Sequence, residues 1–200
     1  MLLVVQGRVA WPKEPETALA EMLDAQPVVA AILDRVPALE LPGWYLGAGC
    51  VTQTVWNALH GFDPRFGIKD YDLIYFDRHD LSERAEKAVE AIADRLVTEL
   101  GVRLDVTNEA RVHLWYEARF GRPIEPYESS EDAIATWPTT ATSVGVRRSS
   151  GAFEVCAPFG LEDLFNMIVR PNKRLVSRDD YEAKAKRWAL MWPRLTVLAW

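Results

Sequence analysis

Trp44-Tyr-Leu-Gly-Ala-Gly-Cys-Val-Thr-Gln-Thr-Val-Trp-Asn-Ala-Leu-His-Gly61 is the stretch of sequence that decides the fold. Its first three residues predict a strand. Gly47 and Gly49, which follow, allow a tight turn and a close approach of the backbone to a ligand. Apolar residues at helical spacing then predict a helix from about Cys50 to His60, which the last glycine of the stretch ends. The unpaired N–H groups and the positive dipole end of such a helix suit a bound phosphate.

A second strand, Ile68-Lys-Asp-Tyr-Asp-Leu-Ile-Tyr-Phe-Asp77, carries two acidic residues two positions apart. Asp70 and Asp72 therefore leave the same face of the strand, with Cα atoms roughly 7 Å apart. The apolar run from Leu73 to Phe76 predicts a central strand, where crowded carboxylates raise each other's pKa and destabilise the fold unless a cation neutralises them. Two carboxylates without a histidine or cysteine ligand beside them favour Mg²⁺ or Mn²⁺ over zinc.

These two segments carry a resemblance to a known group of proteins. The turn Gly47-Ala48-Gly49 before a helix, followed by Lys69-Asp70-Tyr71-Asp72-Leu73, resembles the signature of the DNA polymerase beta-like nucleotidyltransferase superfamily. Within it, the chain looks closest to a family of bacterial nucleotidyltransferase-like proteins of about this length. Ala48 in the turn and the long gap from the turn to Asp70 depart from the compact members. The matching stretches are 44–77, 108–116, 133–138, 154–161 and 192–198.

The resemblance implies a fold and a reaction. The fold is α/β (α+β), with a small mixed sheet flanked by helices and with helical additions at both ends. The reaction moves a nucleoside monophosphate from a nucleoside triphosphate (NTP) to a hydroxyl-type acceptor and releases pyrophosphate. It needs Mg²⁺ or Mn²⁺, because one ion holds the triphosphate and another lowers the pKa of the attacking hydroxyl. The acceptor stays open between a small molecule, a protein and an RNA.

The resemblance also gives roles to single carboxylates. Asp70 and Asp72 would bind metal and take part in catalysis. A superfamily site needs a third carboxylate from a neighbouring strand, and Asp105 is the candidate, on the polar face of a strand predicted from Val102 to Val106. Glu109 is the reserve for that role. The structural alternative for Asp105 is an exposed strand carboxylate with no part in the chemistry.

The phosphates of the nucleotide are expected beside the glycine turn. Backbone N–H groups of Gly47, Ala48 and Gly49 would cradle them, as the resemblance implies. Lys69 either touches a phosphate or points to the opposite face of the strand. Arg111 is a candidate to hold a phosphate through two parallel hydrogen bonds. His113 reads equally as a ligand and as a hydrogen-bonded structural histidine.

The charge of the chain limits its partners. The net charge of −6 disfavours general DNA or other nucleic-acid binding. The last 36 residues depart from this average, since 165–200 holds eight Lys or Arg against three Asp or Glu. Two interpretations of this basic segment stay open: a solvated helix face, or a phosphate or RNA patch beside the acidic site.

The length of 200 residues suits one compact domain. We expect an N-terminal helical segment over 1–40, a nucleotidyltransferase core over 41–160, and a C-terminal helical segment and tail over 161–200. Cys50 and Cys156 lack the spacing of a metal or redox motif, which predicts a reduced, cytoplasmic protein without a zinc site. The N-terminus lacks the features of a signal peptide. The uncharged stretch 41–62 is interrupted by glycines and polar residues, so we reject a membrane span.

The remaining pattern predicts a simple succession of elements. Two short helices fill 14–40. A long helix follows Asp77, with Asp80 and Glu83 as its capping pair. Residues 108–115 read as a strand or an irregular arm, and 144–147 with 153–156 as a hairpin. A helix over 161–168 and a last helix over 179–191 lead to a final strand at 195–198.

Two other functions remain open. An Asp-x-Asp strand also occurs in glycosyltransferases that bind Mn²⁺ and a sugar nucleotide, although the glycine turn before a helix argues against that class. A non-catalytic nucleotide- or protein-binding module that kept the fold is the other alternative.

The loop from Trp137 to Thr142 is expected over the site, where Trp137 either stacks on a base or packs under the loop.

Overall fold

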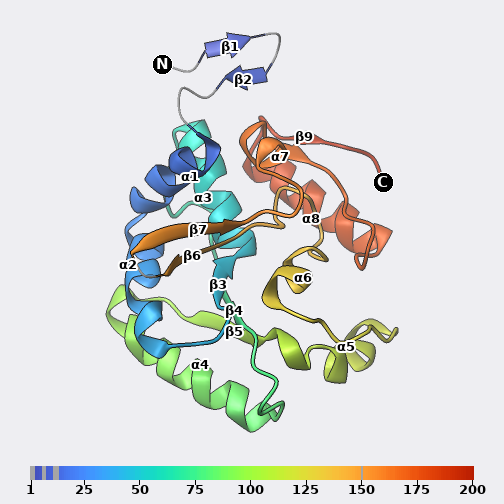
Figure 1. Ribbon diagram of the computed structural model, residues 1–200. Coiled ribbons are helices and arrows are strands. Elements are labelled where there is room, and N and C mark those ends of the chain that lie inside the picture. Colours follow the sequence, from blue (N-terminus) through green and yellow to red (C-terminus); the bar gives the residue numbers. More distant parts are fainter. Residues whose placement is uncertain (1–2, 6–7, 11–13, 150) are drawn as a thin grey trace.

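A five-stranded mixed sheet lies at the centre of the protein (Figure 1). The computed structural model describes residues 3–5, 8–10, 14–149 and 151–200. The strand order is β5-β4-β3-β6-β7, in which β4 and β5 are parallel and the other neighbours antiparallel. This arrangement confirms the predicted small mixed sheet. The strands are β3 Tyr45–Gly47, β4 Tyr71–Tyr75, β5 Leu104–Asn108, β6 Gly145–Ser149 and β7 Ala152–Cys156.

Helices flank this sheet, as expected for the fold class. In Figure 1, α1 and α2 lie to the left of the sheet, and α5, α6 and α8 lie to its right. The α-helices are α1 Pro15–Asp24, α2 Pro27–Arg35, α3 Ala48–His60, α4 Glu83–Val97, α5 His113–Phe120, α6 Ser130–Ile134, α7 Glu162–Phe165 and α8 Arg178–Met191. Short 3₁₀ turns are η1 Val36–Leu39, η2 Thr98–Leu100 and η3 Glu109–Arg111. Small strand pairs join β1 Leu3–Val5 to β2 Arg8–Ala10 and β8 Ile168–Val169 to β9 Thr196–Val197.

The strand–turn–helix–strand unit predicted from the sequence is present. The helix α3 begins at Ala48, two residues earlier than predicted, and ends at Gly61, whose positive φ of 69° suits a glycine. β3 and β4 are antiparallel and place Gly47 opposite Asp72. The N-terminus of α3 therefore lies directly beside the acidic strand.

Three local predictions were wrong: two because a side chain caps a helix, and one because the backbone leaves the helical conformation. The cap of α4 is Ser82, which accepts a hydrogen bond from the Ala85 N–H, rather than Asp80. The stretch predicted as a strand or an irregular arm is helical after Asn108, the last residue of β5, because the Asn108 side chain caps η3 and α5 follows. The helix predicted over 161–168 stops at Phe165, and Met167 has a φ of 56° that no helix continues.

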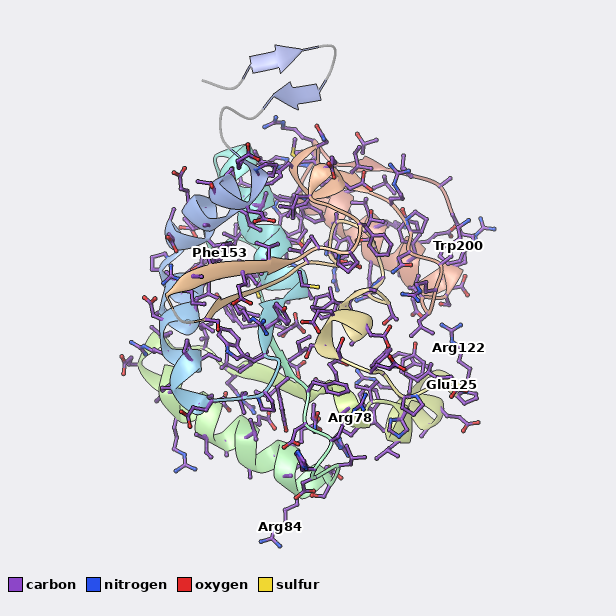
Figure 2. All side chains as sticks on the ribbon, viewed as in Figure 1. Arg78, Arg84, Arg122, Glu125, Phe153 and Trp200 are labelled. Atoms are coloured by element: carbon purple, nitrogen blue, oxygen red, sulfur yellow. The ribbon has the colours of Figure 1, made fainter. Side chains whose placement is uncertain are left out.

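One apolar core joins the three predicted segments. Leu33 from α2, Leu73 from β4 and Phe165 from α7 are buried in the same cluster. Side chains fill the space between the sheet and its helices (Figure 2). In the residues that the structure describes, no helix combines the length and apolar composition needed to cross a membrane.

Buried tryptophans attach the C-terminal helix to α3. The ring of Trp56 packs against Trp188 and Trp192, with centroids 5.6 and 5.5 Å away. Asn57 is fully buried beside them. Its Oδ1 accepts from the Trp192 indole N–H at 2.8 Å, and its Nδ2 donates to the carbonyl oxygens of Pro64 and Phe66. α8 is thereby fixed against the helix that starts at the glycine turn.

We predict that Asn57→Ala lowers the free energy of unfolding by about 3 kcal/mol or more, because it leaves one indole N–H and two carbonyl groups unpaired. Urea unfolding measures the effect. The control is Asn166→Ala, whose amide donates to the Glu162 carbonyl in the turn of α7. Equal stabilities for the two variants would contradict this account of how α8 is held.

Candidate active site

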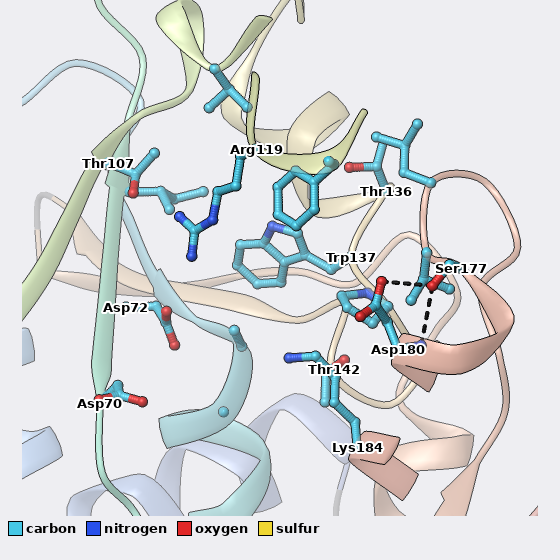
Figure 3. Close-up of a pocket in the computed structure, with 18 of the residues that line it drawn as sticks. Asp70, Asp72, Thr107, Arg119, Thr136, Trp137, Thr142, Ser177, Asp180 and Lys184 are labelled. Atoms are coloured by element: carbon cyan, nitrogen blue, oxygen red, sulfur yellow. Dashed lines mark hydrogen bonds between the residues drawn. The ribbon is translucent and has the colours of Figure 1, made fainter. Parts of the chain in front are cut away.

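A cavity of about 570 Å³ opens between the start of α3, the strands β4 and β5, and the helices α5 and α8 (Figure 3). Its volume lies within the range of small-molecule sites. Asp72 of β4 and Asp70, which directly precedes this strand, line the cavity and project toward its interior. The cavity therefore contains the two aspartates that the sequence singled out.

The two aspartates differ in environment. Asp70 is exposed and precedes β4, while Asp72 is half-buried within it. Burial, reinforced by the charges of Asp105 and Asp70, raises the pKa of Asp72 to about 7. Lys184 and the backbone N–H of Gly49 oppose that rise. Asp72 thus lies where negative charge is crowded and incompletely compensated.

Asp105 lies next to this pair. It is the partner of Asp72 in the parallel register of β4 and β5, so the two side chains belong to the same face. Asp105 is exposed and lines an adjoining hollow of about 550 Å³ rather than the main cavity. Asp70 and Lys69 line both spaces. The predicted third carboxylate is therefore beside the other two, but on the side of the second hollow.

The donor set fits a hard cation. Among the described residues, no three or more His, Cys, Asp or Glu side chains come together as a ready metal site. Mg²⁺ is often held by one or two carboxylates, with water and substrate phosphates supplying its other oxygens. Asp70 and Asp72 match that arrangement because both carry oxygen ligands into a cavity open to solvent.

Packing fixes the first residue of the predicted glycine turn. A Cβ on Gly47 would lie 2.6 Å from the ring of Trp137 and 2.8 Å from the Val144 carbonyl oxygen, so packing demands glycine there. Ala48 adopts a φ of 53°, and its N–H already donates to the Val144 carbonyl at 3.2 Å. Ala48 and Gly49 line the cavity. The Gly49 N–H donates to the Asp72 carboxyl, and the positive end of the helix dipole remains for a ligand.

Of the two cations predicted to hold a phosphate, Lys69 lines the cavity and Arg111 does not. Lys69 is exposed at the border of both spaces, where a phosphate can reach it. Arg111 does not line the cavity. Its buried guanidinium donates to Glu86 at 2.6 Å and to the Leu81 carbonyl at 3.0 Å. Because these partners occupy the guanidinium, the prediction that Arg111 holds a phosphate was wrong. His113 also lies outside the cavity lining, and its Nδ1 has no hydrogen-bond partner in the described part of the chain.

The sequence analysis left open a basic patch beside the acidic site but named none of the α8 residues that line the cavity. Residues at successive turns of this helix and at its cap face the cavity, including the cations Lys184 and Arg187. Figure 3 shows Lys184 and Asp180 across the cavity from Asp70 and Asp72. Two of the eight basic residues of the C-terminal segment thus face the site. The helical spacing of the set was visible in the sequence: Ser177, Asp180, Lys184, Arg187, Trp188 and Met191.

An aromatic wall faces the same space. It combines α5, which the sequence analysis did not recognise as a helix, with the loop that carries Trp137. Arg119 lies 5.8 Å from the Trp115 ring centroid and 5.4 Å from that of Phe120. Trp137 both packs on Gly47 and lines the cavity. The aromatic residues of the wall are Trp115, Tyr116, Phe120, Tyr127 and Trp137.

Glu109, the reserve carboxylate, lies at a different level of the cavity. It opens η3 directly after β5, in which the three steps from Asp105 to Asn108 span about 10 Å. Burial above all, and then the charges of Glu86 and Asp72, raise its pKa to about 8. Glu109 lines the main cavity but is too far along to share one ion with Asp70 and Asp105.

The raised pKa of Asp72 predicts a pH-dependent stability. Its folded pKa lies above the unfolded value, so this carboxyl destabilises the folded protein increasingly as the pH rises from about 4 to about 7. Asp72→Asn cannot ionise. In EDTA, we expect this variant to gain at least about 1 kcal/mol over wild type at pH 8, and much less at pH 4. Urea unfolding at both pH values measures it, and a variant less stable than wild type at pH 8 would refute the charge argument.

Comparisons with known proteins agree with this geometry. A solved protein whose NMR structure reveals a CCA-adding enzyme head domain superposes with a TM-score of 0.72 and 27% sequence identity. The match covers 92% of this chain and 96% of that one. No curated protein was found to match the chain. The similarity confirms the predicted nucleotidyltransferase fold and supports nucleotidyl transfer as the kind of function.

The family comparison covers most of the sequence. A family model described as Nucleotidyltransferase matches residues 34–197, which include both aspartates, the aromatic wall and α8. The resemblance noted from the glycine turn and the acidic strand is thereby confirmed. Since the match extends over far more than half of the chain, the protein belongs to this nucleotidyltransferase family.

Proposed function

We propose that the protein transfers a nucleoside monophosphate from an NTP to a hydroxyl group of an acceptor, releases pyrophosphate and depends on Mg²⁺ or Mn²⁺. The observation that carries the proposal is the position of Asp70 and Asp72 beside the N-terminus of α3, in a cavity whose other walls are cationic and aromatic. The family and the fold support this class of reaction.

Different walls of the cavity would bind different parts of the nucleotide. Asp70 and Asp72 would hold the divalent ion, with Asp105 as a further ligand on the acceptor side. When bound, such ions neutralise charge on the triphosphate and lower the pKa of the attacking hydroxyl. Lys184, Arg187 and the end of α3 bind phosphate oxygens across from the aspartates. The aromatic wall offers faces on which a base stacks.

The transfer step is an exchange of bonds at phosphorus. The acceptor oxygen forms a bond to the α-phosphorus, and the bond from that phosphorus to the bridging oxygen of pyrophosphate breaks. Pyrophosphate leaves with the electron pair, and the hydroxyl proton passes to the carboxylate of Asp105. Asp105 suits this task because it lines the second hollow, where an acceptor can approach Asp70 without crossing the nucleotide cavity. The acceptor class stays open among a small molecule, a protein and an RNA.

One observation favours a second candidate function. In the part of the chain that the structure describes, the acidic side chains do not converge as a ready site of three ligands. A nucleotide-binding module without transfer needs Asp70 and Asp72 but not Asp105. The two functions therefore differ in what the Asp105 carboxylate contributes.

The first test concerns metal dependence. Because the triphosphate must lie beside two carboxylates, we expect NTP affinity to fall at least about ten-fold when EDTA replaces Mg²⁺ or Mn²⁺. Calorimetry with each of the four common NTPs measures it. Equal affinity with and without the metal would remove the ion from this proposal.

The second test separates transfer from binding. Asp105→Asn should leave metal–NTP affinity within a few-fold but cut transfer by orders of magnitude, because its interaction develops mainly in the transition state. Asp70→Asn should lose both. Labelled NTPs, incubated with metal and fractionated cell extract, reveal transfer to RNA, protein or small molecules. Asp179→Asn is the control, since Asp179 is exposed on α8 outside the cavity lining. Binding without transfer in wild type would favour the binding module.

A further inference from the structure

Glu109 is a buried carboxyl that the proposed chemistry does not use. Its side chain lines the cavity, and the residue is 6% exposed. Within the described residues, its carboxyl has no hydrogen bond and no ion pair, in contrast to the neighbouring polar side chains. Among the described residues, the fully enclosed polar atoms without a partner do not include the Glu109 oxygens, which therefore open to the cavity. Such a group facing a cavity is expected to find its partner in a ligand.

The surrounding hydrogen bonds explain why Glu109 stays unpaired. Arg111, the nearest cation along the chain, donates to Glu86. The second oxygen of Glu86 accepts from the Asn108 N–H at 2.8 Å. The Asn108 side chain bonds both the N–H and the carbonyl oxygen of Asp77, which ties the end of β5 to the end of β4. These bonds fix the η3 turn and leave its first side chain facing the cavity.

The position of Glu109 suits the nucleobase rather than the phosphates. Asp105 lies back along β5, in which the three steps from Asp105 to Asn108 span about 10 Å. Glu109 instead adjoins the aromatic wall, where burial above all, and to a smaller extent the nearby Glu109 carboxyl, raise the pKa of Tyr127. Tyr127 itself is already bonded to Thr136 at 2.9 Å. A base stacked on this wall extends its polar edge sideways, where an unpaired carboxyl is the group that can receive it.

We infer that Glu109 is the nucleobase-reading residue of this site, whose carboxyl hydrogen-bonds the Watson–Crick edge of the base. This inference rests on the proposed function. A carboxyl that keeps its proton offers one donor and one acceptor side by side, which complements an N–H next to a ring nitrogen or carbonyl oxygen. Burial favours that protonated form. A base whose edge is blocked by methyl groups cannot make the pair.

The test uses pairs of nucleotides that differ at the base edge alone. Wild type should bind ATP more tightly than N6,N6-dimethyl-ATP, and UTP more tightly than N3-methyl-UTP, by about ten-fold or more in at least one pair. Glu109→Ala should bind both members of each pair equally. Glu109→Gln should keep the discrimination, because its amide offers the same donor and acceptor. Glu117→Gln, on the exposed side of α5 and outside the cavity lining, should behave as wild type.

Inorganic tripolyphosphate separates this inference from the proposed function. Its metal-dependent binding reports the phosphate end alone and should be unchanged in Glu109→Ala. If wild type binds tripolyphosphate but does not distinguish blocked from unblocked bases, Glu109 does not read the base, and the phosphate site stands. If Glu109→Ala weakens tripolyphosphate as much as ATP, its effect is structural and the inference fails. If neither NTPs nor tripolyphosphate bind, both the inference and the proposed function fail.

Discussion

The close contact at Gly47 is the constraint on which the site depends. β3 has three residues, and its last one pairs with Asp72 on one side and Gly145 on the other. The ring of Trp137 and the Val144 carbonyl occupy the space where any side chain at Gly47 would project. The chain must therefore leave the sheet at once, and α3 begins at the next residue. This geometry places the positive end of a 13-residue helix beside the acidic strand.

Carboxyl groups at two levels of the cavity lie in surroundings that disfavour their negative charge. Burial above all, and then neighbouring acids, raise the pKa of Asp72 and that of Glu109. Their neighbours are well satisfied: Glu86 accepts from Arg111 and from the Asn108 backbone. The free energy that ionisation of these two carboxyls costs is thus lost at the cavity, where a ligand can restore it. Acidic groups with raised pKa values gathered at one cavity mark a binding site more specifically than the fold does.

Local patterns made part of this structure predictable. The glycine turn, α3 and the acidic strand follow from spacing within about 30 residues, and the register of Asp105 follows from two neighbouring strands. Arg111 was assigned wrongly because the sequence shows its charge but not its partner Glu86, 25 positions earlier. The α8 wall was missed for a similar reason. Its place depends on the bond between Trp192 and Asn57, 135 positions apart, which no periodicity reveals.

The two spaces around the aspartates suggest from which side the acceptor of the proposed reaction approaches. Asp70 and Lys69 border both the main cavity and the second hollow, whereas Asp72 and Glu109 line the first and Asp105 the second. An in-line displacement brings the attacking oxygen and the leaving oxygen to opposite sides of phosphorus. A nucleotide that fills the main cavity, with its base at Glu109 and its phosphates at α8, would leave the second hollow as the approach for the acceptor. The residues that read the base and those that meet the acceptor therefore lie on different elements, so either set can change while Asp70 and Asp72 stay in place.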